Sequence, residues 1–250
     1  IVNIQTEPQT PGTTYTLSYK GKSTGLSFTA GLEAPQLLNV QAGVRQVALS
    51  WSTVTDATHF SVYMKKTGDS SFTFAGEVSA PLTFYIVSEL EEGKEYLFYV
   101  KASNGLISSL PSNVVSGGHI PVGGYVYKVQ VLHGGTKSVT DVTYDSSSGQ
   151  ALYLVPADLT LGDKLIVWLS DGPDTDTLSE SISLPASGKI LINNNTGMPA
   201  TIEDGRKISF FPSDGLFFLS SGQTYPMEIT GLTYGADNVP FYFKLFFRKP

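Results

Sequence analysis

The side chains that most often perform catalysis are few in this chain and lie far apart in it. His59, His119 and His133 fall in different segments, and no two have a metal-binding spacing such as H-x-x-x-H. Two glycines follow His133, as in the oxyanion turn of some hydrolases, but no G-x-S-x-G nucleophile follows. The chain has no cysteine, which excludes a thiol nucleophile and thiolate zinc ligands. These residues argue against a triad hydrolase.

Paired carboxylates are the other arrangement to consider, because glycoside hydrolysis needs only two of them. The candidates are Asp141 with Asp145, Glu89 with Glu91 and Glu92, and Glu203 with Asp204. Each pair lies among turn residues or at the end of a predicted strand, where solvated acids are the ordinary interpretation. We therefore predict that the protein is not an enzyme.

The densest group of oxygen ligands is the run from Asp171 to Asp176. Asp171, Asp174 and Asp176 could bind Ca²⁺ in a loop of a β-sandwich, although the run lacks the order and the distal glutamate of an EF-hand. A plain acidic turn is the alternative interpretation. We expect no other cofactor.

Aromatic side chains offer a different kind of chemistry, because an exposed ring can stack on the C–H face of a sugar. The chain has 13 tyrosines, 14 phenylalanines and two tryptophans, most of them at alternating positions that predict a core. Trp51 is expected in the core, whereas Trp168 is either buried or an exposed platform on the other face of its strand. The candidate glycan-binding residues are Trp168, Tyr125, Tyr127 and Tyr144.

The elements that position these residues are predicted to be β-strands throughout. Alternation with period two recurs along the chain, helical periodicity is hard to find, and 25 glycines and 14 prolines interrupt the runs. The fold class is therefore all-β. No apolar run approaches the 18 residues of a membrane-spanning helix, so no membrane insertion is expected.

The charge of the chain limits its partners. Charged residues make up 15% of the sequence and the net charge is −6, which disfavours binding to a phosphate backbone, so no nucleic acid partner is expected. The surface must rely on Ser, Thr, Asn, Gln and Gly. This composition is typical of virion proteins, adhesins and extracellular sandwiches.

The middle third of the chain carries the clearest motifs. Seven short predicted strands follow one another at intervals of 8 to 12 residues, the pattern of an immunoglobulin-like sandwich. They include Leu49-Ser50-Trp51, Phe60 to Tyr63, a Leu-x-x-Gly-x-x-Tyr run from Leu90 to Tyr96, and a last hairpin from Val100 to Asn113. With these four motifs in order, residues 34–117 resemble a fibronectin type III domain. The Arg-Gly-Asp triplet of that family's integrin-binding members is absent.

The rest of the chain has no motif of a known family. Ten predicted strands over residues 118–250 indicate a second β-sandwich or jelly-roll-like domain. Its closing strand, Val239 to Phe247, is amphipathic, and its outer side chains form a candidate interface: Tyr242, Lys244, Phe246 and Arg248. Residues 1–33 hold two or three strands, too few for a core, so we expect them to pair with the C-terminal domain or with a neighbouring subunit.

Two function classes follow from these features. The first is a non-enzymatic structural or adhesive component of an extracellular assembly, such as a phage tail, collar or fibre protein, located in a virion or at a cell surface. The run from Pro11 to Gly21 resembles strand repeats of phage fibre and tail proteins. Its partners would be other protein subunits, most simply copies in a homo-oligomer. The alternative is a bacterial surface glycan-binding protein or a carbohydrate-binding accessory module, with a cell-surface glycan as partner.

Overall fold

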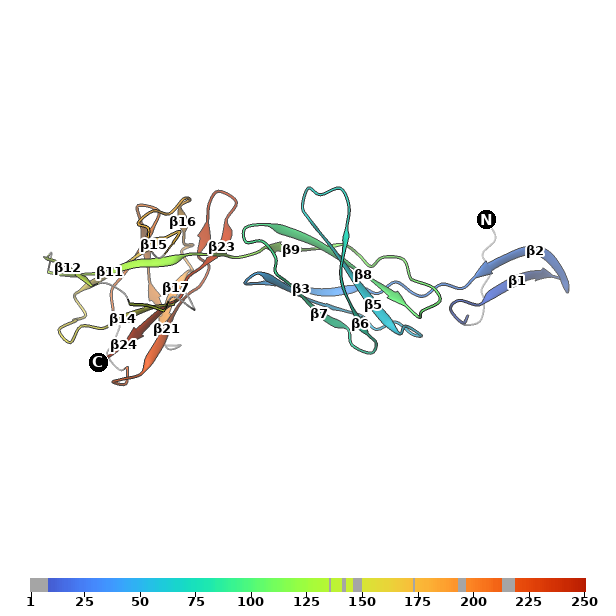
Figure 1. Cartoon of the computed structure of the whole chain (residues 1–250), viewed down its shortest axis with the longest axis horizontal. Coiled ribbons are helices and arrows are strands. Elements are labelled where there is room, and N and C mark those ends of the chain that lie inside the picture. The colour runs from blue at the N-terminus through green and yellow to red at the C-terminus, as the bar shows by residue number, and fades with distance from the viewer. Residues whose placement is uncertain are drawn as a thin grey trace. The chain divides into compact units, whose positions relative to one another are not determined.

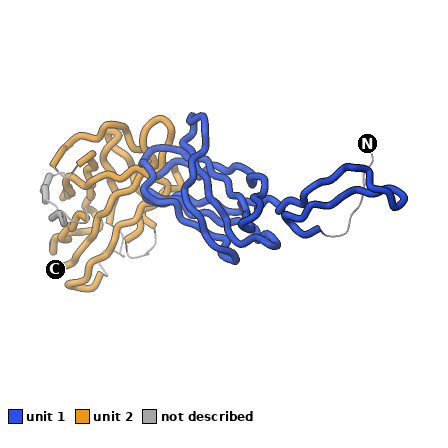
Figure 2. Tube along the Cα trace, turned by 45° about the vertical axis from the view of Figure 1, so that its right-hand side comes forward, with its two compact units in different colours: residues 1–120 blue, residues 121–250 orange. Residues whose placement is uncertain are grey.

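The structure is a computed structural model of the 250-residue chain. It describes residues 9–134, 136–140, 143–145, 150–172, 174–192, 197–212 and 219–250, of which 136–140 and 143–145 are described by their backbone alone. All of the regular structure in these ranges is β-strand (Figure 1), which confirms the all-β fold class. The chain divides into two compact units, residues 1–120 and residues 121–250 (Figure 2).

The first unit begins with a β-hairpin. β1 (Thr14–Tyr19) pairs antiparallel with β2 (Lys22–Thr29) through a two-residue turn. Lys20 and Gly21 both have positive φ angles, +48° and +74°, as the type I′ turn of a tight hairpin requires. In the described part of the chain, β1 and β2 form a sheet of their own and pair with no other strand.

The remainder of the first unit is a sandwich of two antiparallel sheets. One sheet has three strands in the order β3-β4-β7, and the other has four in the order β6-β5-β8-β9. The strands are β3 (Leu37–Gly43), β4 (Gln46–Trp51), β5 (His59–Lys66), β6 (Thr73–Ser79), β7 (Phe84–Ser88), β8 (Glu95–Ser103) and β9 (Val115–His119). A sandwich of three and four strands is the immunoglobulin-like arrangement that the spacing of the sequence predicts.

The core of this sandwich comes from the alternating residues of the predicted strands. Val47, Leu49 and Trp51 are buried along β4, and they face Phe60 and further buried residues of the opposite sheet. The rings of Trp51 and Phe60 lie 5.6 Å apart between centroids. Trp51 is therefore a core residue, as expected.

The Leu-x-x-Gly-x-x-Tyr run forms a tyrosine corner before β8. Leu90 and Tyr96 are buried, and Gly93 has a φ of +73° that suits glycine. The Tyr96 hydroxyl oxygen accepts a hydrogen bond from the backbone N–H of Glu91 at 3.2 Å. This bond ties the start of β8 to the preceding loop.

The second unit contains three sheets. Five strands follow the order β12-β11-β15-β20-β19, six follow β13-β14-β24-β21-β17-β18, and four follow β10-β23-β22-β16. The strands are β10 (Val122–Gly123), β11 (Tyr125–His133), β12 (Thr136–Thr140), β13 (Thr143–Asp145), β14 (Gln150–Leu154), β15 (Lys164–Ser170), β16 (Ile182–Ser183), β17 (Lys189–Ile192), β18 (Met198–Pro199), β19 (Thr201–Glu203), β20 (Lys207–Phe210), β21 (Thr224–Ile229), β22 (Thr233–Tyr234), β23 (Val239–Tyr242) and β24 (Leu245–Arg248). Two of the pairings, β10 with β23 and β14 with β24, are parallel.

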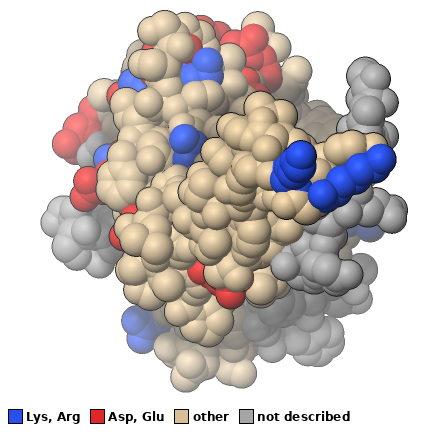
Figure 3. All heavy atoms as spheres, turned by 90° about the vertical axis from the view of Figure 1, so that its right-hand side faces the viewer, with Lys and Arg blue, Asp and Glu red and all other residues tan. Residues whose placement is uncertain are grey.

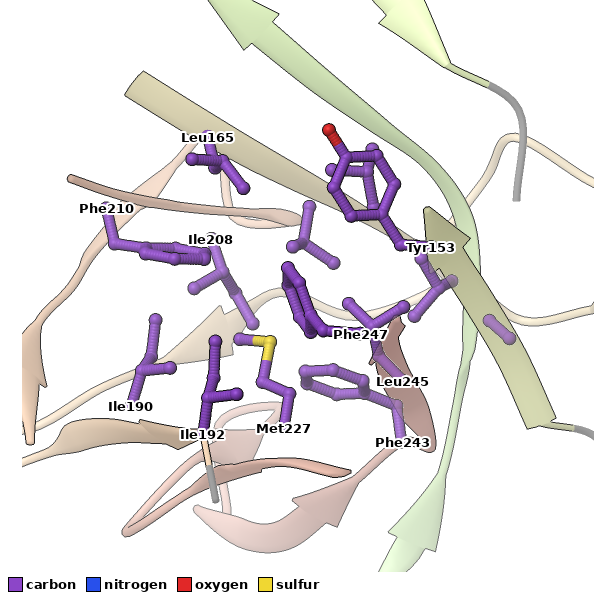
Figure 4. Close-up of a cluster of buried hydrophobic side chains, with 14 of the residues drawn as sticks. Tyr153, Leu165, Ile190, Ile192, Ile208, Phe210, Met227, Phe243, Leu245 and Phe247 are labelled. Carbon is purple, nitrogen blue, oxygen red and sulfur yellow. The ribbon is translucent and has the colours of Figure 1, made fainter. Parts of the chain in front are cut away.

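Residues of all three sheets fill the core of the second unit (Figure 4). Leu165 and Phe210 come from the five-stranded sheet, and Tyr153, Met227 and Phe247 come from the six-stranded sheet. Tyr153 and Phe247 meet edge to face with their ring centroids 5.4 Å apart. Burial between facing sheets gives this unit its own hydrophobic core.

The C-terminal strands differ from the sequence prediction in one place. Val239 to Phe247 forms two strands, β23 and β24, instead of one, and they belong to different sheets. The side-chain alternation continues across the break, since Phe243 is as buried as Phe241, but the backbone changes its hydrogen-bonding partners there. The predicted strand from Leu216 to Leu219 lies, except for Leu219, outside the described residues.

Candidate functional site

Trp168 lies on β15, the middle strand of the five-stranded sheet. Leu165, Val167 and Leu169 of this strand are buried in the core, so the alternation turns Trp168 to the outer face. Trp168 is partly exposed there. Its position is thus intermediate between the two predicted alternatives, a core residue and an exposed platform.

Cationic side chains from both neighbouring strands surround the Trp168 ring. Lys128 of β11 and Lys207 of β20 are the direct cross-strand partners of Trp168. The ammonium nitrogen of each lysine lies 4.1 Å from the ring centroid, and the guanidinium carbon of Arg206 lies 5.1 Å from it. Each contact is a cation–π interaction worth about 0.5–1 kcal/mol at an exposed site and more when desolvated.

Two of the predicted tyrosines share this face. The ammonium group of Lys128 also lies 5.4 Å from the ring centroid of Tyr127, which is 36% exposed. A β-bulge between Val126 and Lys128 places these neighbours side by side. Tyr125 pairs with Ser170, two residues from Trp168, which puts it on the same side of the sheet. The side chain of Tyr144 lies outside the described residues.

The acids nearest the Trp168 ring are already paired. Lys207 forms an ion pair with Asp204, and Lys164 forms one with Glu203. The hydrogen bond from Lys207 lowers the pKa of Asp204, and the hydrogen bond from Lys164 lowers the pKa of Glu203. In the part of the chain that the structure describes, neither Lys128 nor Arg206 forms an ion pair. The face around the ring therefore carries an excess of positive charge.

The indole N–H of Trp168 is a further unpaired donor. Its nitrogen, Nε1, is buried and has no hydrogen-bond acceptor among the described residues. A buried donor without an acceptor costs about 1–3 kcal/mol. The cluster of Lys128, Arg206 and Trp168, called the cationic face below, thus offers several donors.

The three cations were not predicted as site residues from the sequence. The aromatic residues were predicted from their type, whereas Lys128, Arg206 and Lys207 are ordinary surface residues in their own segments. They meet Trp168 because of strand order and register, which join positions about 40 residues apart. Their outward positions in alternating strands were the only available signal.

His133, which was considered for catalysis, lies next to the carboxylate of Asp163. His133 Nδ1 lies 3.0 Å from Asp163 Oδ1, and the backbone N–H of Thr160 donates to Asp163 Oδ2 at 2.6 Å. Burial opposes the ionisation of Asp163, but the hydrogen bonds from Thr160 and the charge of His133 outweigh it and lower the pKa of Asp163. Within the described residues His133 has no hydrogen bond to a hydroxyl group, so this pair ties a turn to the end of β11.

Three acids of the candidate carboxylate pairs have lowered pKa values. Glu91 accepts a hydrogen bond from Lys66 at 2.5 Å, which lowers the pKa of Glu91 and keeps it ionised. Glu203 and Asp204 are also held ionised by their lysines. Asp141 lies outside the described residues, as does the side chain of Asp145. A general acid needs a raised pKa, which none of these three acids has.

The acidic run is largely exposed in the part that the structure describes. Among the described residues no three His, Asp or Glu side chains come close enough to hold a metal ion. Asp174 and Asp176 are exposed, and Asp171 instead accepts a hydrogen bond from the Ser179 hydroxyl at 2.7 Å. The calcium site predicted at Asp171, Asp174 and Asp176 stays a prediction.

The candidate interface of the closing strands has no free backbone edge. β23 lies between β10 and β22, and β24 lies between β14 and β21. Strand addition at these edges is therefore blocked. Tyr242, Lys244, Phe246 and Arg248 alternate with the buried residues and are partly or fully exposed. An interface made by these four side chains stays a prediction.

Comparison with known families identifies the middle of the chain. The family model of the fibronectin type III domain matches residues 33–117, so this segment is a fibronectin type III domain. The match agrees with the predicted boundaries, 34 and 117, to within one residue at either end. Such a domain is a protein-interaction or structural module, is typically non-catalytic and is common in extracellular proteins.

Several solved structures are similar to part of the chain. A fibronectin type III domain of human collagen XX is 18% identical, with a TM-score of 0.30, over 34% of this chain and 91% of that one. A structure described as a myokine is 22% identical, with a TM-score of 0.31, over 35% and 97%. A β-1,2-glucanase from Parabacteroides distasonis is 24% identical, with a TM-score of 0.34, over 37% of this chain and 13% of the glucanase.

Two further searches gave negative results. No curated protein sequence matches the chain. The described residues include no helix with the length and apolar character needed to cross a membrane.

Proposed function

We propose that the chain is a non-enzymatic structural and adhesive component of an extracellular or virion assembly, and that the β1–β2 hairpin joins it to a second copy. The single observation that carries this proposal is the exposure of apolar side chains on the hairpin. All eight residues of β2 are exposed, and Tyr19, Leu26 and Phe28 are 69%, 63% and 46% exposed. An apolar hairpin surface of this kind is typical of a contact site.

Physical chemistry supports a partner for the hairpin. An isolated two-stranded hairpin is at best marginally stable in water, and its two outer edges carry unpaired backbone groups. The hairpin is ordered internally by its I′ turn and by the stacked rings of Tyr15 and Phe28, whose centroids lie 5.7 Å apart. An ordered edge with apolar side chains favours strand addition by another chain.

Charge favours a second copy as that partner. The hairpin segment, residues 9–30, contains Lys20 and Lys22 and no acid, in a chain whose net charge is −6. A positive hairpin is attracted to the negative remainder of a neighbouring copy. Figure 3 looks at the molecule from one end and shows a surface that is mostly uncharged, as a chain with 15% charged residues predicts.

In this proposal the two sandwiches have different tasks. The fibronectin type III domain acts as a spacer or docking module, and residues 121–250 present the face that meets a receptor or ligand. The resemblance of the run from Pro11 to Gly21 to strand repeats of phage fibre and tail proteins supports a virion location for the assembly.

Light scattering across a wide concentration range tests the proposal. We expect the chain to form an oligomer of definite size, and the variant Tyr19→Thr/Leu26→Thr/Phe28→Thr to be a monomer, since threonine keeps strand propensity but removes the apolar surface. Leu110→Thr in the fibronectin type III domain is the matched control, because Leu110 is similarly exposed. A monomeric parent chain, or a hairpin variant that still assembles, would contradict the proposal.

The cationic face supports a second candidate function. A bacterial surface glycan-binding protein or a carbohydrate-binding accessory module needs an exposed aromatic side chain with polar groups around it. Tyr127 and Trp168 lie on one face and share the ammonium group of Lys128. Binding of oligosaccharides to the chain, measured by calorimetry, tests this candidate separately from assembly.

A further inference from the structure

We propose that the cationic face binds an acidic saccharide, with Lys128 and Arg206 holding its anionic group and Tyr127 packing against a sugar ring. The inference rests on the second candidate function and names its ligand class. It does not depend on the hairpin. Carboxylated, sulfated and phosphorylated sugars share the chemistry that this face would recognise.

The donor pattern of the face points to an oxyanion. Lys128 and Arg206 carry charged donors that have no carboxylate partner within hydrogen-bonding distance in the described part of the chain. A group of donors without an acceptor is complementary to an anionic oxygen, and charge-assisted hydrogen bonds are roughly twice as strong as neutral ones.

Trp168 is a positioning residue in this site. Its ring has an ammonium nitrogen from each flanking strand at 4.1 Å, so the π surface is already engaged. The contacts bring the charged groups of Lys128 and Arg206 to 4.1 and 5.1 Å from the centroid of one ring. The aromatic ring that remains open to a sugar is Tyr127, which is 36% exposed and lies next to the Lys128 ammonium group.

The neighbouring acids do not cancel the positive charge of Lys128 and Arg206. Asp204 is paired with Lys207, and Glu203 is paired with Lys164. In a chain of net charge −6, a local excess of positive charge favours acidic ligands at this face. Free nucleic acid would meet the repulsion of the whole chain.

The same face of the sheet is buried further along the strands. Gln130, Ile166 and Ser209 occupy outward positions two residues beyond Lys128, Trp168 and Lys207, and all three are buried. The accessible part is therefore the end of the face that holds Trp168 and Tyr127. A ligand of one or two sugar units would fill it.

Isothermal titration calorimetry of the full chain with oligogalacturonate tests the inference, and its methyl ester is the neutral probe of the same shape. We expect measurable binding of the acidic form, at least tenfold weaker binding of the ester, and a steep loss of affinity with salt. Heparin oligosaccharides and a glycerol-phosphate teichoic acid distinguish the sulfated and phosphorylated sources from the carboxylated one.

Variants assign the binding to the cationic face. We expect Lys128→Gln and Arg206→Gln each to weaken binding tenfold or more, Lys128→Arg to retain it, and Tyr127→Phe to bind better than Tyr127→Ser. Lys101→Gln is the matched control, because the Lys101 ammonium lies 5.8 Å from the Tyr63 ring centroid in the other unit and its loss changes the net charge equally. Circular dichroism verifies that each variant is folded.

Three outcomes would overturn the inference. Equal binding of the acidic sugar and its methyl ester would show that the anionic group is not recognised, while leaving the glycan-binding candidate standing. Binding of poly-glutamate as tight as that of the sugar would assign the site to an acidic peptide. Binding of no probe, with folded protein, would remove both the inference and the candidate.

Discussion

The fibronectin type III domain and the C-terminal unit are both built of β-sheets, but their strands are paired in different ways. In the domain every strand pairing is antiparallel, and its motif residues, such as Trp51 and Tyr96, sit in its core. In the C-terminal unit two pairings are parallel and join strands about 90 to 120 residues apart. No motif marks its core.

This difference explains why one region can be recognised and the other cannot. All residues of the tyrosine corner lie within a run of seven, so the motif can be recognised in the sequence. No local sequence pattern indicates that β14 pairs with β24, because parallel strands need a long connection between them. The cationic face depends on other non-local pairings, those of β15 with β11 and β20, so the region that is harder to recognise also contains the candidate binding chemistry.

The largest expected effect comes from removing a central phenylalanine of either core. Phe98→Ala in the domain and Phe247→Ala in the C-terminal unit each remove a fully buried ring, which costs about 3–5 kcal/mol of unfolding free energy. We expect each variant to lower the thermal transition of its own unit alone. Calorimetry measures this, and equal shifts of both transitions in either variant would show that the two cores are coupled.

Two glycines allow the tightness of packing in the two units to be compared. A Cβ at Gly117 would lie 2.9 Å from the ring of Phe98, and one at Gly124 would lie 2.2 Å from the ring of Phe241. We expect Gly124→Ala to destabilise its unit more than Gly117→Ala destabilises the domain, within the range of about 1–3 kcal/mol for overpacking. Gly31→Ala, with no atom within 4 Å, is the control, and urea unfolding measures all three.

The tyrosine corner tests how much a local motif contributes. Tyr96→Phe keeps the buried ring but removes the oxygen that accepts the hydrogen bond from Glu91 N–H. We expect a loss of about 1 kcal/mol, confined to the domain. Tyr225→Phe is a matched control in the other unit, where the Tyr225 hydroxyl accepts from Ser220 N–H at an exposed position. An equal loss in the two variants would mean that the corner has no special role.

Acid stability gives the smallest expected effect. A carboxyl whose pKa is lowered on folding contributes stability above its unfolded pKa and loses it as the pH falls through the folded value. The pKa of Asp163 is lowered, so its contribution is present above about pH 4 and disappears below it. We expect Asp163→Asn to lower the stability of the C-terminal unit at pH 7 and to bring its unfolding midpoint towards the parent value near pH 2. An undiminished difference at low pH would assign the effect to packing.

Part of the fold and of the candidate site was predictable from particular residues. The period-two patterns around Leu49 and Phe98 and the motif from Leu90 to Tyr96 specify strands and a corner through local chemistry. Trp168 and Tyr127 were predicted as ligand-binding candidates from their ring chemistry. The break between β23 and β24 was not predictable, because the alternation of buried side chains runs unchanged through Phe243 while the hydrogen-bonding partners change.

By itself the sequence determined that the chain is all-β, that its middle is a fibronectin type III domain and that its net charge disfavours nucleic acid. These properties depend on composition, on side-chain alternation and on short motifs. Only the tertiary structure decided that Lys128, Arg206 and Lys207 surround Trp168 and that the side chain of Asp171 accepts a hydrogen bond from Ser179. Register between distant strands sets such contacts, and register is a property of the whole sheet.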